Sequence, residues 1–164
     1  MSALTTGLAL SAALTLGLAA GKGGAVQVNG LSITPPKKWE QSVEDGTHKW
    51  EGSGGKESFS FDVFRPEGAE LGAGECVDKL VSAVGGEGWE RLVVGGQPAA
   101  KRSSTDELED GRKVRTHTHV GCDGKTRWAL TYVVDAKLKA KPQVEKVVSS
   151  IRFTSADAKK GDSK

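Results

Sequence analysis

The sequence has no large excess of charge of either sign, and this lack limits the partners that it can have. It contains 23 lysine and arginine residues against 21 aspartate and glutamate residues, which gives a formal net charge of +2. Basic and acidic residues alternate along most of the chain, so no long basic surface is expected to hold a phosphate backbone. We therefore predict no nucleic-acid partner.

Recognisable catalytic motifs are missing as well. No G-x-S-x-G sequence is present, and the glycine-rich stretch at 52–58 has Glu57 after Lys56, where a phosphate-binding loop needs serine or threonine. Cys122 near His119 comes closest to a nucleophile beside a base, which leaves a small hydrolase as an alternative. We predict that the chain is not an enzyme and needs no cofactor.

The first 25 residues contain a long apolar stretch. Residues 3–20 carry no charge and are rich in leucine and alanine, and small residues follow them, as in a secretory signal peptide. The preceding residues lack the lysine or arginine that a signal peptide usually has. Because about 18 apolar residues can just span a thin bilayer, an uncleaved N-terminal anchor is the alternative. We predict a signal peptide or N-terminal apolar segment over 1–25, export to the periplasm or medium, and a disordered polar tail over 154–164.

Cysteine is scarce, with two in the whole chain. In an oxidising compartment two cysteines in a small domain are more often paired than free, so we predict a disulfide between Cys76 and Cys122. A reactive or metal-bound thiol is the alternative.

Residues 26–153 show the pattern of a single α+β domain. Short alternating runs are separated by Asn-Gly and Asp-Gly pairs, which favour hairpin turns. Apolar residues at helical spacing predict short helices over 74–86 and 142–153. We expect an antiparallel sheet of about six or seven strands flanked by two short helices. The predicted strands are 26–28, 31–34, 39–43, 48–52, a segment around 57–65, 89–94, 98–105, 112–122 and 125–134.

Three segments of this domain resemble a known family. LSITPPKKWE at 31–40, VVGGQPAAKR at 93–102 and VEKVVSSIRF at 144–153 occur in the order and context seen in the PsbP/DcrB-like superfamily, which includes the Ran-binding Mog protein. The resemblance implies an antiparallel sheet with helices packed on its faces. It also implies an exported, noncatalytic protein that acts by binding other proteins.

Two histidines form the candidate metal site. His117 and His119 lie two residues apart on a predicted strand, so both imidazoles face the same side, with Asp123 or His48 as a possible third ligand. The other interpretation is a solvated polar row.

Tryptophan stands out in a chain with few aromatic residues. Trp39 and Trp128 are expected to pack in the core, whereas Trp50 and Trp89, next to acids and glycines, are candidates for a partner surface.

Together these features predict an exported noncatalytic binding or accessory protein of the cell envelope or secreted fraction. Its predicted partner is another envelope or secreted protein, and it would contact a membrane only through an uncleaved leader. The alternative is a metal-binding envelope protein that uses His117 and His119.

Overall fold

The computed structural model describes residues 24–52, 54–68, 70–138 and 142–154. The predicted leader, as far as residue 23, and the predicted tail from residue 155 lie outside the described residues. Within the described part of the chain, no helix is long and apolar enough to cross a membrane.

The fold is α+β, as predicted, with a seven-stranded antiparallel sheet, a second sheet of three strands and two short helices. The large sheet has the strand order β3-β4-β5-β9-β8-β7-β6, and the small one β1-β2-β10. In chain order the elements are β1 (Val26–Val28), β2 (Leu31–Ile33), β3 (Glu40–Glu44), β4 (Thr47–Glu51), β5 (Glu57–Phe64), α1 (Ala73–Val84), β6 (Glu90–Val94), β7 (Gln97–Glu107), β8 (Lys113–Cys122), β9 (Arg127–Asp135), α2 (Val144–Ser149) and β10 (Arg152–Phe153).

Two of the predicted hairpin turns have the backbone that their sequences favour. Asn29 and Gly30, between β1 and β2, have φ of 45° and 90°, and Asp45 and Gly46, between β3 and β4, have φ of 50° and 83°. A two-residue turn with φ > 0 at both positions matches the right-handed twist of the strands that it joins. The turn residues therefore fix the register of both hairpins.

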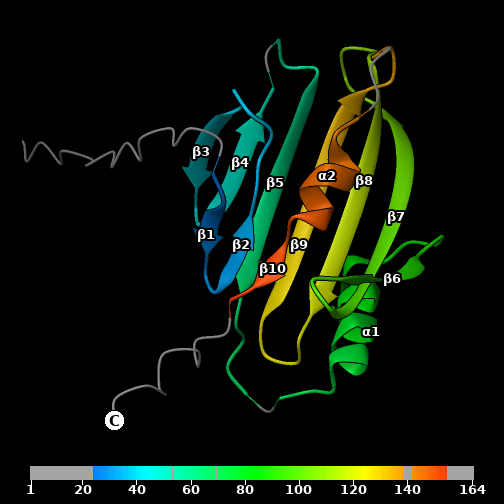
Figure 1. Ribbon diagram of the computed structural model, residues 1–164. Helices are drawn as coiled ribbons and strands as arrows, with labels where there is room; N and C mark the ends of the chain where they lie inside the picture. The colour runs from blue at the N-terminus through cyan, green and yellow to red at the C-terminus, as the bar shows by residue number, and fades with distance from the viewer. Residues whose placement is uncertain (1–23, 53, 69, 139–141, 155–164) are drawn as a thin grey trace, which may run out of the picture.

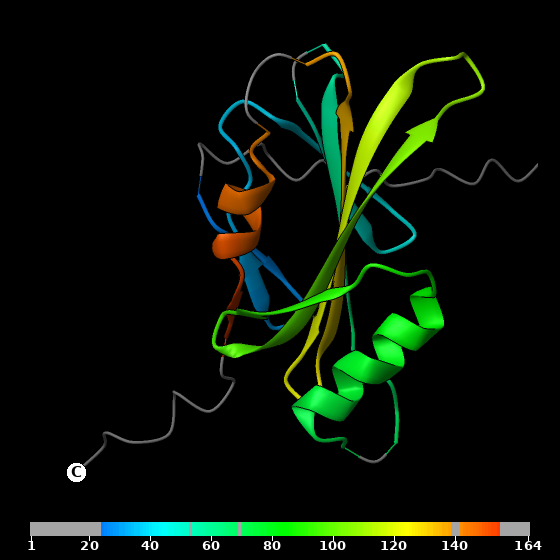
Figure 2. The same ribbon diagram turned by 90° about the vertical axis from the view of Figure 1, so that its right-hand side faces the viewer.

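The two helices cover opposite faces of the large sheet. Figure 2 shows α2 and the small sheet on one side and α1 on the other. On the first side, α2 packs on alternate residues of β5 and β9, including Phe59, Phe61, Leu130 and Tyr132, to form the main core. On the second side, α1 forms a smaller core with β7 and β8.

The predicted second helix is shorter than expected. It ends at Ser149, and residues 152–153 form β10, which pairs with β2 (Figure 1). The apolar residues up to Ile151 have helical spacing, and for this reason the sequence did not reveal that the backbone becomes extended at residue 152. Pairing with β2 closes the small sheet over the main core.

Candidate functional site: a groove beside the second helix

A half-buried polar cluster lies at the edge of the main core. The Tyr132 hydroxyl on β9 donates a hydrogen bond to the Glu57 carboxylate, the first residue of β5, and accepts one from the backbone N–H of Gln143 at 3.1 Å. Burial, followed by the hydrogen bond to Glu57, raises the pKa of Tyr132 above its usual value. The phenol thus stays protonated and ties the segment before α2 to the large sheet.

Trp39 forms a wall above this cluster. Its ring centroid lies 5.8 Å from that of Phe59 and 6.0 Å from that of Tyr132. A Cβ atom at Gly52 would lie 3.0 Å from the Trp39 ring, so glycine at this position lets the indole pack against the backbone. The expected packing role of Trp39 is confirmed, although the ring is only half-buried.

Two hollows meet at Gln143, and together we call them the Gln143 groove. The smaller hollow has a volume of about 170 Å³ and the larger about 550 Å³. The smaller is lined by Trp39, Gly52, Lys56, Glu57, Leu138 and Gln143. The larger is lined by Thr34, Pro35, Pro36, Lys37, Gln143, Lys146, Val147 and Ser150.

The outer wall of the larger hollow is attached to α2 by hydrogen bonds. The Thr34 N–H donates to the Ser150 hydroxyl oxygen at 2.8 Å, and that hydroxyl donates to the Val147 carbonyl at 2.6 Å. Two prolines follow Thr34, and their rings restrict the backbone that forms the wall. This side of the groove is therefore held in place by both covalent and hydrogen-bonded constraints.

The groove is rich in unpaired positive charge. Lys37, Lys56 and Lys146 are exposed, and none of them forms an ion pair with another described residue. Among the described residues that line the groove, Glu57 is the one carboxylate, and it already accepts the Tyr132 hydroxyl. The local potential therefore favours a ligand with negative charge.

The candidate histidine pair lies on the same face as α2, but deeper than a solvated row would. His117 pairs with Tyr132 and His119 with Leu130, and His119 is only 2% exposed. The His117 Nδ1 atom lies 2.8 Å from the Ser103 hydroxyl. The two imidazoles share one face of the sheet, as expected, and the alternative of a solvated row is wrong for His119, because that side chain is buried.

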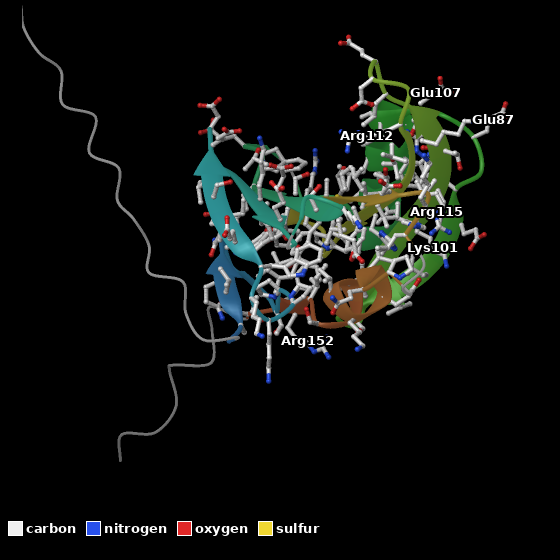
Figure 3. The ribbon with its side chains drawn as sticks, turned by 90° about the horizontal axis from the view of Figure 1, so that it is seen from above. Glu87, Lys101, Glu107, Arg112, Arg115 and Arg152 are labelled. Atoms are coloured by element: carbon white, nitrogen blue, oxygen red, sulfur yellow. A yellow bond between two sulfur atoms is a disulfide. The ribbon has the colours of Figure 1, made fainter. Side chains whose placement is uncertain are left out.

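Burial lowers the pKa of both imidazoles. It is the main cause of the lowered pKa of His117, with a contribution from Arg115, and it lowers the pKa of His119 to about 4, with contributions from His117 and Lys101. Lys101 is opposite His119, and Arg115 is two residues before His117, so both cations share this face (Figure 3).

The structure does not bring the suggested third ligands to the pair. His48 stacks on Trp50 in β4, which is three places away from β8 in the sheet. The Asp123 carboxylate accepts hydrogen bonds from the backbone of Lys125 and Thr126 in the turn after β8. No group of three or more His, Cys, Asp or Glu that could hold a metal is found in the described part of the chain.

The predicted disulfide is present. Cys76, in the first turn of α1, is bonded to Cys122 at the end of β8, with the Cα atoms 6.0 Å apart. Both cysteines are fully buried in the smaller core. Neither sulfur is therefore available as a nucleophile or a metal ligand in this state.

The prediction that Trp50 lies at a partner surface is wrong. Trp50 is only 1% exposed, because its pairing with Phe59 places its ring in the main core, with the two ring centroids 4.7 Å apart. Trp89 is half-buried: its indole N–H donates to the Gly85 carbonyl at 3.1 Å, and the Arg102 guanidinium lies 5.1 Å from the ring centroid. A partner surface at Trp89 stays a prediction.

Sequence reasoning missed most of the groove. Tyr132, Glu57 and Gln143 come from three separate segments, so no local motif joins them. A partial signal exists in the run Pro35 to Trp39, where two prolines, two lysines and a tryptophan stand together. That run combines a rigid backbone with charge and an aromatic ring.

Comparisons with known proteins give information about the fold and not about the function. The chain is similar to a solved structure from Bacteroides thetaiotaomicron, with a TM-score of 0.59 and 16% identity. The match covers 76% of this chain and 45% of that one, so the common part is less than half of that protein's length. No family model and no curated protein matches the chain. The resemblance to the PsbP/DcrB-like superfamily therefore stays a prediction.

Proposed function

We propose that the chain is an exported, noncatalytic binding protein that uses the Gln143 groove to hold another protein of the cell envelope or secreted fraction. The observation that carries this proposal is the groove itself. It combines apolar side chains with three lysines that form no ion pair with another described residue, and one of its lining residues, Glu57, accepts a hydrogen bond from the Tyr132 hydroxyl. Concave sites of this composition are typical of ligand recognition.

Two features support export. The apolar, uncharged stretch over 3–20 has the composition of a signal peptide. The disulfide between Cys76 and Cys122 is of a kind that persists in oxidising compartments and is rare in the cytosol.

The groove chemistry supports binding rather than catalysis. General acid–base catalysis needs a titrating group that is free to reach the substrate. Glu57 is engaged by Tyr132, and the raised pKa of Tyr132 removes the phenolate as a base near neutral pH. The remaining charged groups that line the groove among the described residues are lysines with long, exposed side chains.

Photo-crosslinking from inside the groove tests the proposal. A photoreactive residue replaces Lys146, and the same residue replaces Lys79 on α1, on the opposite side of the sheet, as the matched control. Crosslinked products from the host's envelope and medium are identified by mass spectrometry, which also reads the N-terminus and the cysteine state. We expect one defined protein at position 146 and not at 79, joined to a trimmed, disulfide-bonded chain. Equal products at both positions, or a full-length reduced chain in the cytoplasm, would contradict the proposal.

A second candidate function is metal binding by His117 and His119. It is favoured by one observation: Nε2 of His117 and Nδ1 of His119 are buried and have no hydrogen-bond partner among the described residues. Neutral imidazole is the form that binds zinc, copper or nickel. Lys101 and Arg115 on the same face oppose a bound cation. Calorimetric titration with each metal tests this function, and equal binding by the variant with His117→Ala and His119→Ala would exclude it.

A further inference from the structure

The two hollows of the Gln143 groove differ in size and chemistry. The smaller, of about 170 Å³, has Trp39 and Leu138 in its wall. A buried cavity of about 150 Å³ in another protein holds one benzene molecule, so this volume suits one large apolar side chain. The larger hollow, of about 550 Å³, exceeds the volume of one side chain and lies in the range of sites for extended ligands.

The larger hollow differs from an ordinary apolar cleft because it carries positive charge. Lys37 enters it from the loop after β2, and Lys146 from α2. The described residues that line it contribute no carboxylate. The free protein thus places two like charges around one space, and a bound carboxylate would relieve their repulsion.

A group that can pair with the backbone of a bound peptide lies in the same groove. Gln143 lines both hollows; its backbone N–H donates to Tyr132 and its carbonyl accepts from the Val147 N–H, so its side-chain amide is the polar group of this residue that a ligand can use. A side-chain amide can both donate to a peptide carbonyl and accept from a peptide N–H. This pairing capacity favours an extended peptide that passes from one hollow to the other.

We infer that the occupant of the Gln143 groove is an extended, acidic segment of the partner protein, with one bulky apolar side chain in the Trp39–Leu138 hollow and its carboxylates beside Lys37 and Lys146. This inference rests on the proposed function and specifies the chemistry of the partner. Lys37, Lys56 and Lys146 form no ion pair with another residue that the structure describes, and their charge complementarity with an acidic segment selects this occupant.

Binding of labelled synthetic peptides to the full mature protein tests the inference. The probe is a twelve-residue peptide rich in glutamate with one central phenylalanine, measured by fluorescence anisotropy at low and high salt. One matched peptide has glutamine in place of glutamate, and another has alanine in place of phenylalanine. We expect the probe to bind at least about tenfold more tightly than the glutamine peptide, since exposed ion pairs contribute up to about fivefold each. Its affinity should fall with added salt.

Variants of the protein locate the site. The double variant with Lys37→Gln and Lys146→Gln should weaken probe binding about tenfold. Lys79→Gln, which removes a cation from α1, should leave it unchanged. Trp39→Leu keeps an apolar side chain and should reduce the preference for phenylalanine over alanine. Because Lys37 and Lys146 are exposed, circular dichroism should show the double variant to be folded like the parent.

Three results would overturn the inference. The first is equal affinity for the acidic and glutamine peptides, and the second is an equal loss on Lys79→Gln. The third is binding to phosphatidylglycerol vesicles through Lys37 and Lys146 without binding to the peptide, which would assign the groove to a membrane surface. If crosslinking at position 146 yields a defined protein while the acidic peptide shows no preference, this inference fails and the proposed function stands. If both experiments fail, the groove is not the binding site.

Discussion

The Trp128 indole lies directly against the Gly121 backbone on the neighbouring strand, where a Cβ atom at position 121 would come within 2.5 Å of the ring. Trp128 is fully buried in the main core, and its register partner in β8 is Gly121. A side chain of any other residue type therefore has no space unless the indole moves. The glycine was not singled out in the sequence, yet it determines how closely β8 and the indole approach.

Gly121→Ala should destabilise the protein by about 1–3 kcal/mol, the usual cost of forcing extra volume into a packed core. The free energy of unfolding in urea measures this loss. Gly74→Ala is the matched control, because Gly74 is exposed in α1 and a Cβ there meets nothing within 4 Å. The control should be neutral or stabilised by up to about 1 kcal/mol. Equal stability of Gly121→Ala and the parent would show that Trp128 repacks freely.

The disulfide should supply a large part of the total stability. Cys76 and Cys122 are 46 residues apart in sequence, and the chain-entropy model gives about 4 kcal/mol for closing a loop of this length. Reduction should lower the urea midpoint strongly. The variant with Cys76→Ser and Cys122→Ser should be no more stable than the reduced protein, since its hydroxyls are buried in an apolar core, and it should no longer respond to reductant. An unchanged midpoint after complete reduction would mean that the α1 core holds without the bond.

Local signals in the sequence predicted most of the strands, because hairpins depend on neighbouring residues. Asn29-Gly30 and Asp45-Gly46 specify their own turns. The end of the second predicted helix was wrong for the opposite reason. Phe153 joins β2 through a partner more than a hundred residues away, and no local pattern reports that pairing.

The contrast between local signals and long-range pairing also explains which candidate sites were predicted correctly. The cysteine pair was predictable, since a chain with two cysteines allows one intramolecular pairing. Trp50 was misassigned because its neighbours in sequence are polar, while burial is set by Phe59 on the next strand. The groove was missed because Trp39, Glu57 and Gln143 meet only in the folded chain. Residue type suggested chemistry, but the sheet register decided which side chains meet.

Stability should fall in mildly acidic solution because of His119. In the folded protein, burial lowers its pKa to about 4, from an ordinary value of 6.5. Above pH 6.5 the imidazole is neutral in both states. Between pH 6.5 and 4 the unfolded chain binds a proton that the folded protein does not, so the free energy of unfolding decreases as the pH falls. The loss should reach about 3 kcal/mol near pH 4 and level off below it.

Urea unfolding at several pH values checks this dependence. Carboxylates also titrate in part of the range, so the comparison is between the parent and His119→Gln. The difference in their unfolding free energies should change between pH 6.5 and 4 and stay constant above 6.5. A constant difference across the whole range would show that His119 is protonated in the folded protein as readily as in the unfolded chain.

The Tyr132 hydroxyl should contribute to both stability and the shape of the groove. Tyr132→Phe removes the donor to Glu57 and the acceptor for the Gln143 N–H, which leaves two polar groups without their partner. We expect a loss of about 1–3 kcal/mol in unfolding free energy. The double variant with Tyr132→Phe and Glu57→Gln should recover part of this loss, because the unpaired carboxylate is then replaced by a neutral amide. A double-mutant cycle measures the coupling between the two side chains. If the two losses simply add, the hydroxyl and the carboxylate act independently, and the bond between them does not hold Glu57 in its place beside the groove.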